Sequence, residues 1–207
     1  ATLGTVSITS NKVEVKDGRT NRQIVATFKA PNFVQKDGSI KLDSGGKVVA
    51  NGTRDVSFGF TIPSTVTGPR PIILYGHGFF GGWNQGTRGT WNAIATKYKY
   101  NTAATNLGFH EGVENLTTAA IMTSMSKLNE VVAEVIQSLA NVTALQRVVT
   151  EQLVTLLNED TSGNKATLLD KDKIVYHGIS NGGTFGYVIA CTSPLLERAS
   201  IIVGGGG

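Results

Sequence analysis

The sequence predicts an α/β fold, a mostly parallel sheet with helices on both faces, preceded by an antiparallel lead-in and interrupted by a helical insertion. Two observations carry this prediction. Between Pro71 and Val203, short apolar runs alternate with segments of helical periodicity, as in strands joined by crossover helices. The first sixty residues instead contain short strand-like runs separated by Gly-containing turns, as in antiparallel hairpins. The 207 residues, 40% of them hydrophobic, suffice for one substantial core.

Residues 1–55 are expected to form the antiparallel β lead-in. Strands are predicted at residues 5–9, 12–16 and 23–29, with turns at Asp17-Gly18, Asp37-Gly38 and Ser44-Gly45-Gly46. The following run, Val56 to Ile62, alternates apolar with small or polar residues, and Pro63 ends it. We therefore assign residues 56–207 to a second unit.

This second unit is expected to build the parallel sheet. The continuous apolar run Ile72-Ile73-Leu74-Tyr75 is typical of a strand buried on both faces. Further strands are predicted at residues 101–107, 173–177 and 199–203, with helices at 90–98 and 182–192.

A helical insertion is predicted at about residues 112–160. Apolar residues recur there at three- and four-residue steps from Leu116 to Leu157. We expect two or three packed helices, broken near Asn141, in preference to one long helix.

Composition excludes several classes of function. The formal net charge is +4, but Lys and Arg are scattered and form no basic run with interleaved aromatics, so no nucleic-acid partner is expected. No apolar stretch reaches the roughly 18 residues of a membrane span. The single cysteine, Cys191, cannot form an internal disulfide, and no Cys/His spacing indicates a metal site. We therefore expect neither a metal nor a cofactor.

The segment Gly178-Ile179-Ser180-Asn181-Gly182 has the pattern G-x-S-x-G, which by itself arises by chance in about one of five such glycine-rich sequences. Its context is more informative, because it lies between a predicted strand and a predicted helix, where a nucleophile elbow is found. The turn imposes strained dihedrals on the serine, and Cβ atoms at Gly178 and Gly182 would clash. Ser180 is thus the predicted nucleophile. The alternative is a glycine-rich turn with an incidental serine.

A second motif, His77-Gly78-Phe79-Phe80-Gly81-Gly82, directly follows the apolar run that ends at Tyr75. A loop at this place supplies one backbone N–H to an oxyanion hole. We assign that donor to Phe79, with Phe80 as second choice and as a possible substrate-side residue. Asn181, at the start of the next helix, is expected to supply the other N–H. The alternative is a loop adjusted only for packing.

The sequence has three histidines, and none is predicted to be the catalytic base. His77 precedes Ser180 in the chain and is expected to shape the oxyanion loop through hydrogen bonds, or to be simply structural. His177, in the strand before Ser180, is expected to be a core histidine. His110 follows a predicted strand at the sheet edge and is a possible substrate-side residue, the alternative being an ordinary loop histidine.

The motifs Tyr75-Gly76-His77-Gly78-Phe79 and His177-Gly178-Ile179-Ser180-Asn181-Gly182-Gly183 resemble those of the α/β-hydrolase superfamily. They are most similar to bacterial exported lipase- or esterase-like serine hydrolases, and the resemblance covers about residues 56–207. It implies hydrolysis of a small-molecule or polymeric carboxylic ester through an acyl-enzyme on Ser180. It also implies a secreted or periplasmic location.

In this superfamily the triad acid and histidine follow the serine in chain order. After Ser180 the sequence holds one carboxylate, Glu197, and no histidine. We therefore expect an N-terminal, nucleophile-bearing portion whose sheet is incomplete at the C-terminus. A C-terminal fragment or second chain is expected to supply the acid and the histidine. The alternatives are a non-catalytic binding module on a hydrolase scaffold, or an amidase or peptidase using the same machinery.

Overall fold

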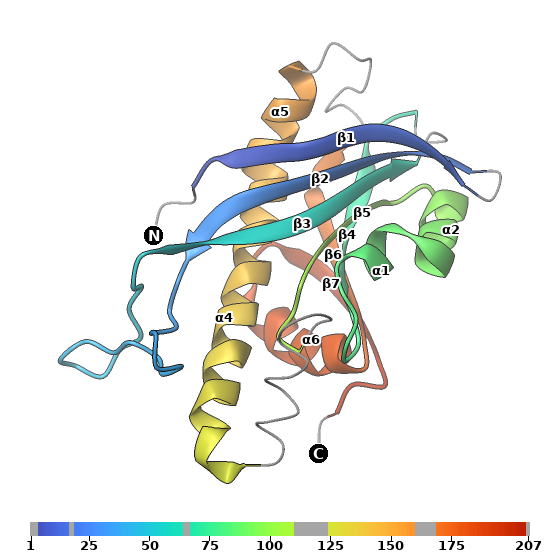
Figure 1. Cartoon of the computed structure of the whole chain (residues 1–207). Coiled ribbons are helices and arrows are strands. Elements are labelled where there is room, and N and C mark those ends of the chain that lie inside the picture. The colour runs from blue at the N-terminus through green and yellow to red at the C-terminus, as the bar shows by residue number, and fades with distance from the viewer. Residues whose placement is uncertain (1–3, 17–18, 64–66, 110–123, 160–168, 206–207) are drawn as a thin grey trace.

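The computed structural model describes residues 4–16, 19–63, 67–109, 124–159 and 169–205, and its strands form one seven-stranded sheet (Figure 1). The strands are β1 (Val6–Lys16), β2 (Arg19–Pro31), β3 (Thr53–Pro63), β4 (Arg70–Gly76), β5 (Asn101–Thr105), β6 (Leu169–Ile179) and β7 (Leu196–Ile202). The helical segments are α1 (Asn84–Thr87), α2 (Gly89–Tyr98), η1 (Met125–Lys127), α4 (Leu128–Arg147), η2 (Val148–Leu153), α5 (Val154–Glu159) and α6 (Asn181–Thr192). The predicted α/β class is confirmed.

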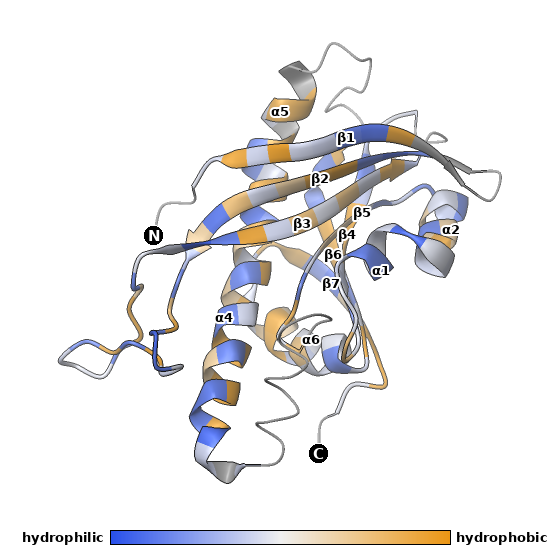
Figure 2. Cartoon of the chain, viewed as in Figure 1, coloured by the Kyte–Doolittle hydropathy of each residue, from blue (hydrophilic) through white to orange (hydrophobic). Residues whose placement is uncertain are grey.

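The sheet is mixed, with strand order β1-β2-β3-β5-β4-β6-β7. The lead-in strands β1, β2 and β3 pair antiparallel, and β3 pairs antiparallel with β5, whereas β5, β4, β6 and β7 are parallel. Apolar and polar residues alternate along the lead-in strands (Figure 2), and the second half of β3, from Phe58 to Pro63, is buried on both faces. The lead-in strands and the parallel strands belong to the same sheet. The division into two domains after residue 55 stays a prediction.

The lead-in differs from the prediction at its first strand. Residues 5–9 and 12–16 were expected to be separate strands, but they form the single strand β1. The register against β2 shifts between Ile8 and Ser10, so the strand continues through a local irregularity.

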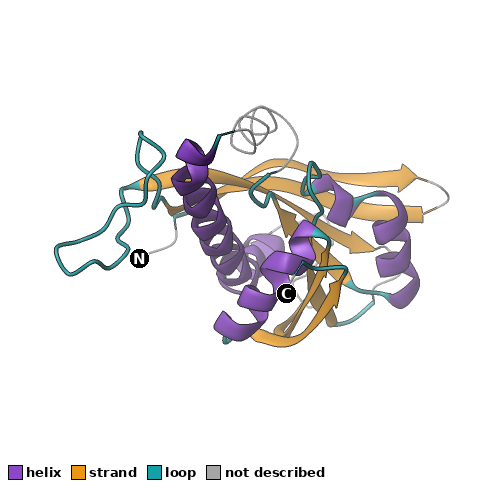
Figure 3. Cartoon of the chain, turned by 90° about the horizontal axis from the view of Figure 1, so that it is seen from below, coloured by secondary structure: helices purple, strands orange, loops and turns teal. Residues whose placement is uncertain are grey.

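Successive residues of the central strands face opposite sides of the sheet. Leu74 and Tyr176 belong to the buried core that includes side chains of α4 and α6. Tyr75 and His177 face the other side, where both rings contact Trp91 of α2. Helices therefore cover both faces, as the view from below also shows (Figure 3).

The prediction of a helical break near Asn141 is wrong. The described part of the insertion is helical without interruption from Met125 to Glu159, with a π-helical stretch, η2, between α4 and α5. Asn141 stays inside the helix because its Oδ1 accepts a hydrogen bond from Gln137 Nε2 one turn earlier, at 2.8 Å. Gln137 in turn donates to the Pro31 carbonyl of β2, at 3.0 Å. A polar residue with internal partners gives the helix no reason to end.

None of the described helices is both long and apolar enough to cross a membrane.

Candidate active site

Ser180 occupies the sharp turn between β6 and α6. Its backbone lies at φ 55° and ψ −116°, a conformation that non-glycine residues seldom adopt. Its N–H donates to the Ile202 carbonyl of β7 at 2.9 Å, and its carbonyl accepts from Thr184 N–H at 3.0 Å. The side chain is half-buried. The turn therefore presents the hydroxyl beyond the carboxyl ends of the parallel strands, as the motif predicts.

Close backbone packing explains the glycines around this turn. A Cβ atom at Gly178 would overlap the carbonyl oxygen of Gly182, and one at Gly182 would overlap the backbone of Gly76 in β4. The predicted clash is therefore present, although the atoms that exclude a side chain at Gly182 belong to β4 and not to Gly178. Strand, turn and helix approach one another too closely for any larger residue.

Tyr176 fills the space beneath the turn, and the sequence analysis missed this role. Its ring lies against the positions that would be occupied by Cβ atoms of Gly76, Gly178 and Gly186, and its hydroxyl donates to the Gly182 carbonyl at 2.7 Å. Burial raises the pKa of the Tyr176 phenol, so the hydroxyl stays a donor. The glycines on three different elements around one tyrosine are the signal that could have identified it.

The predicted oxyanion loop lies next to Ser180. The registered pairs Tyr75 with His177 and Gly76 with Gly178 bring the ends of β4 and β6 together. A Cβ atom at Gly78 would lie 3.8 Å from Ser180 Oγ, which is ordinary contact. The loop and the hydroxyl therefore border the same space.

His77 fixes this loop through both ring nitrogens, as the sequence indicated. The ring is fully buried; its Nε2 accepts from Leu107 N–H at 2.8 Å, and its Nδ1 lies 2.7 Å from the Gly78 carbonyl. Because the Leu107 amide can only donate, Nε2 must be the unprotonated nitrogen and Nδ1 must carry the proton. The His77 carbonyl also accepts from Gly182 N–H at 2.8 Å. His77 therefore joins β4 to the helix that follows Ser180.

The two candidate donors in this loop are not equivalent. Phe80 N–H already donates to the Phe109 carbonyl at 2.8 Å. Within the described part of the chain, no carbonyl accepts a hydrogen bond from Phe79 N–H, and Asn181 lies at the first position of α6, where its N–H has no partner inside the helix. The geometry therefore favours Phe79 over Phe80 as the partner of Asn181.

The segment after β5 supports both sides of the site. Gly108 N–H donates to Ser138 Oγ of α4 at 2.6 Å, and the Gly108 carbonyl accepts from Asn181 Nδ2 at 3.0 Å. The Phe109 carbonyl holds Phe80, as described above, and the Phe109 ring contacts that of Phe79, with centroids 5.4 Å apart. Sequence analysis missed this segment because most of its contacts are made by backbone atoms. His110, the predicted substrate-side residue, lies outside the described residues.

His177 is a core residue, as predicted, and lies away from Ser180. Its ring stacks on Trp91 with centroids 4.2 Å apart and planes inclined by 8°. Burial lowers the pKa of His177 below its ordinary value of 6.5, because the charged form loses its hydration.

This lowered pKa predicts a pH-dependent stability. Below about pH 6.5, His177 binds a proton in the unfolded chain but stays neutral in the folded chain. The free energy of unfolding therefore falls as the pH falls from 6.5 towards the lowered pKa. The slope from this one residue is at most about 1.4 kcal/mol per pH unit. Urea unfolding at several pH values should show a smaller loss for His177→Phe, which keeps the stack but cannot titrate. Parallel curves for the two proteins would contradict this.

Comparisons with known proteins find similar folds among solved structures but no match by sequence. No family model matches the sequence, and no curated protein sequence matches it. Among solved structures, a glucuronoyl esterase from Teredinibacter turnerae has a TM-score of 0.51 at 13% identity, with 99% of this chain and 46% of that chain covered. An S-formylglutathione hydrolase from Agrobacterium tumefaciens has a TM-score of 0.50 at 15% identity, with 95% and 61% covered. The chain has the α/β-hydrolase fold. It spans about half to three fifths of the length of the solved structures named here.

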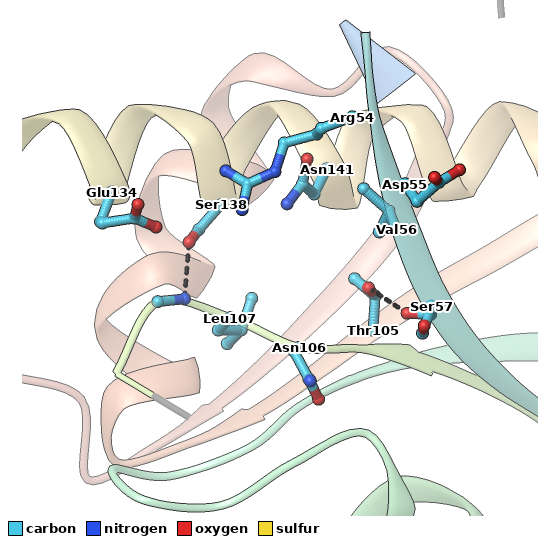
Figure 4. Close-up of a pocket in the computed structure, with 11 residues that line it drawn as sticks. Arg54, Asp55, Val56, Ser57, Thr105, Asn106, Leu107, Glu134, Ser138 and Asn141 are labelled. Carbon is cyan, nitrogen blue, oxygen red and sulfur yellow. Dashed lines mark hydrogen bonds between the residues drawn. The ribbon is translucent and has the colours of Figure 1, made fainter. Parts of the chain in front are cut away.

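Three cavities lie around the α/β-hydrolase sheet, in the part of the chain that the structure describes. One, of about 150 Å³, is polar and lies between β3, the end of β5 and α4; Arg54 reaches across it from β3 (Figure 4). A second, of about 650 Å³, lies on the face of His177 and Trp91. Neither is lined by Phe79 or Asn181. The third, of about 250 Å³, is lined by both.

The described residues contain no group of His, Cys, Asp or Glu side chains that could hold a metal ion.

Proposed function

We propose that this chain carries the nucleophile of a serine hydrolase that cleaves carboxylic esters through an acyl-enzyme on Ser180. The observation that carries the proposal is the strained, half-buried Ser180 at the start of α6, next to a loop that contains a second amide for an oxyanion. The likeness to esterases supports the fold, and the chemistry is inferred from the site.

In the proposed reaction, Ser180 Oγ bonds to the ester carbonyl carbon while a histidine takes the hydroxyl proton. The carbonyl oxygen becomes an oxyanion that accepts hydrogen bonds from Phe79 N–H and Asn181 N–H. The bond to the alcohol then breaks, and the alcohol leaves with the proton from the histidine. Water, activated by the same histidine, hydrolyses the acyl-enzyme and restores Ser180. The N-terminus of α6 favours the oxyanion further through its dipole.

We also propose that the histidine and its acid come from outside residues 1–207. His77 uses both ring nitrogens within the fold and His177 stacks on Trp91, whereas His110, like both of them, precedes Ser180 although the triad histidine of this fold follows the serine. This proposal predicts that native mass spectrometry of an active preparation will detect additional polypeptide, either covalently continuous with this chain or bound to it. Esterase activity from a species with the mass of residues 1–207 alone would exclude it. Export from the cell, which the sequence resemblance implies, stays a prediction.

The test of the proposed function is covalent labelling of the intact protein with a fluorophosphonate, followed by peptide mapping. The adduct is expected on Ser180, in a protein that hydrolyses p-nitrophenyl acetate. Hydrolysis with labelling at another residue would sink the assignment to Ser180. If the protein is neither labelled nor able to hydrolyse the ester, a non-catalytic binding module is favoured instead. If Ser180 is labelled but amides are cleaved preferentially, an amidase or peptidase is favoured.

A further inference from the structure

We propose that the 250 Å³ cavity beside Ser180 binds the acyl group of the substrate and selects esters of medium-length apolar acids. This inference rests on the proposed function and adds a substrate class to it. The cavity lies between α4, α6 and the loops after β4 and β5. Its lining residues are Phe79, Phe109, Val135, Leu139, Asn181, Thr184, Phe185 and Val188.

The position of the cavity fits the acyl side of an ester. Phe79 and Asn181 line it, and their amides are the proposed oxyanion donors. A carbonyl whose oxygen contacts both amides has its carbon next to Ser180 Oγ, beside two residues that line the cavity, so we expect the acyl substituent on that carbon to extend into it. The polar and the large cavities described above are not lined by either residue, and so lack this connection.

The chemistry of the walls fits an apolar chain. Six of the eight lining residues are aromatic or aliphatic, and the Asn181 carboxamide is already bonded to the Gly108 carbonyl. The walls therefore offer little to compensate a charged or hydroxylated acyl group for lost hydration. Buried apolar carbon is favoured, and each methylene is expected to raise kcat/KM by at most about fourfold, which corresponds to the roughly 0.8 kcal/mol of a fully buried methylene.

The volume of the cavity sets an upper limit on length. A dry cavity of about 150 Å³ accommodates benzene, or about 25 Å³ per carbon atom. At that density 250 Å³ has room for about ten carbons, and a flexible chain packs less densely than a ring. We therefore expect an optimum at acyl groups of about six to ten carbons.

Val188 offers a way to fill the cavity without altering the core. It lies on α6 and is 44% exposed, whereas Phe185, another wall residue on that helix, is 5% exposed and part of the core. Val48 is a matched control, because it is also 44% exposed but lies in the segment between β2 and β3, and does not line the cavity. The two substitutions Val188→Trp and Val48→Trp therefore add the same volume at different places.

The experiment measures kcat/KM of the full-length protein on p-nitrophenyl esters from acetate to hexadecanoate. In the wild type, the ratio of octanoate to acetate is expected to exceed about tenfold, with a decline beyond about ten carbons. Val188→Trp should lower that ratio at least tenfold and shift the optimum to shorter chains, while Val48→Trp should leave it unchanged. Acetate hydrolysis with labelled Ser180 but no chain-length preference, or a ratio unaffected by Val188→Trp, would overturn the inference while the proposed function stands.

A binding measurement keeps the inference testable if the protein is not an esterase. Octanoate binding is followed by NMR in Ser180→Ala with and without Val188→Trp. Weaker binding in the double variant supports the cavity even if labelling and hydrolysis fail; absence of octanoate binding overturns it. If Val188→Trp, but not Val48→Trp, lowers the melting temperature by more than about 5 °C, the inference is also overturned. Such a loss would show that the new Trp clashes with protein atoms, so that this space is not free for an acyl group.

Discussion

Replacement of Ser180 by alanine is expected to lower kcat for ester hydrolysis by about 10⁴- to 10⁶-fold and to abolish fluorophosphonate labelling. The nucleophile acts as a unit with its base, so its loss removes the covalent pathway and leaves only the contribution of the oxyanion donors and of substrate binding. The fold should be retained. Ser180 bonds to Ile202 and Thr184 through its backbone N–H and carbonyl, not through its hydroxyl. Alanine therefore preserves both hydrogen bonds.

Steady-state kinetics and thermal unfolding of the two proteins test this prediction. Ser200→Ala is a suitable control, because Ser200 is an exposed serine in the adjacent strand β7 and should be replaceable without loss of activity. A decrease in kcat of less than about tenfold for Ser180→Ala would show that another residue is the nucleophile.

Replacement of Gly182 by alanine is expected to destabilise the protein by about 3 kcal/mol or more. The new Cβ would overlap the carbonyl of Gly76, and the Gly76 Cα would lie only 2.8 Å away. Backbone atoms in the centre of a parallel sheet cannot move aside as a flexible side chain can, so the cost lies at the upper end of that for overpacking. The same displacement should separate α6 from β4 and reduce activity.

Gly68→Ala is the matched substitution, since nothing lies within 4 Å of a Cβ at that position and its φ is not in the left-handed region. Urea unfolding should show a change for Gly68→Ala within about 0.5 kcal/mol. A cost below about 1 kcal/mol for Gly182→Ala would mean that strand and helix at the turn are less closely packed than the structure indicates.

The parts of the site that the sequence predicted are those where a rare conformation requires a particular residue. Gly178 and Gly182 indicated the tight turn around Ser180, and the structure places the serine in a strained backbone conformation, as expected. The glycine-rich loop after β4 was predicted from its glycines and from its place directly after the apolar run that ends at Tyr75. In each case the constraint is steric and local, so it leaves a trace in the residue types themselves.

The parts that could not be predicted depend on contacts between distant segments. The supports after β5 are backbone groups of Leu107, Gly108 and Phe109, whose hydrogen bonds do not depend on their side chains. The continuity of α4 through Asn141 depends on Gln137 and its partner in β2. Propensity alone favours a break at an asparagine, and tertiary hydrogen bonding outweighs it.

The hydrogen bonds of Gly108 and Phe109 have a consequence for thermal motion at the site. The Gly108 carbonyl holds the Asn181 side chain, and the carbonyl of the next residue, Phe109, holds Phe80 N–H, so both flanks of Ser180 are tethered to two adjoining peptide groups. We therefore expect a fluctuation of this short segment to displace the helix start and the loop in the same direction. Such a correlated displacement would keep the separation of the Phe79 and Asn181 amides more constant than the position of either one.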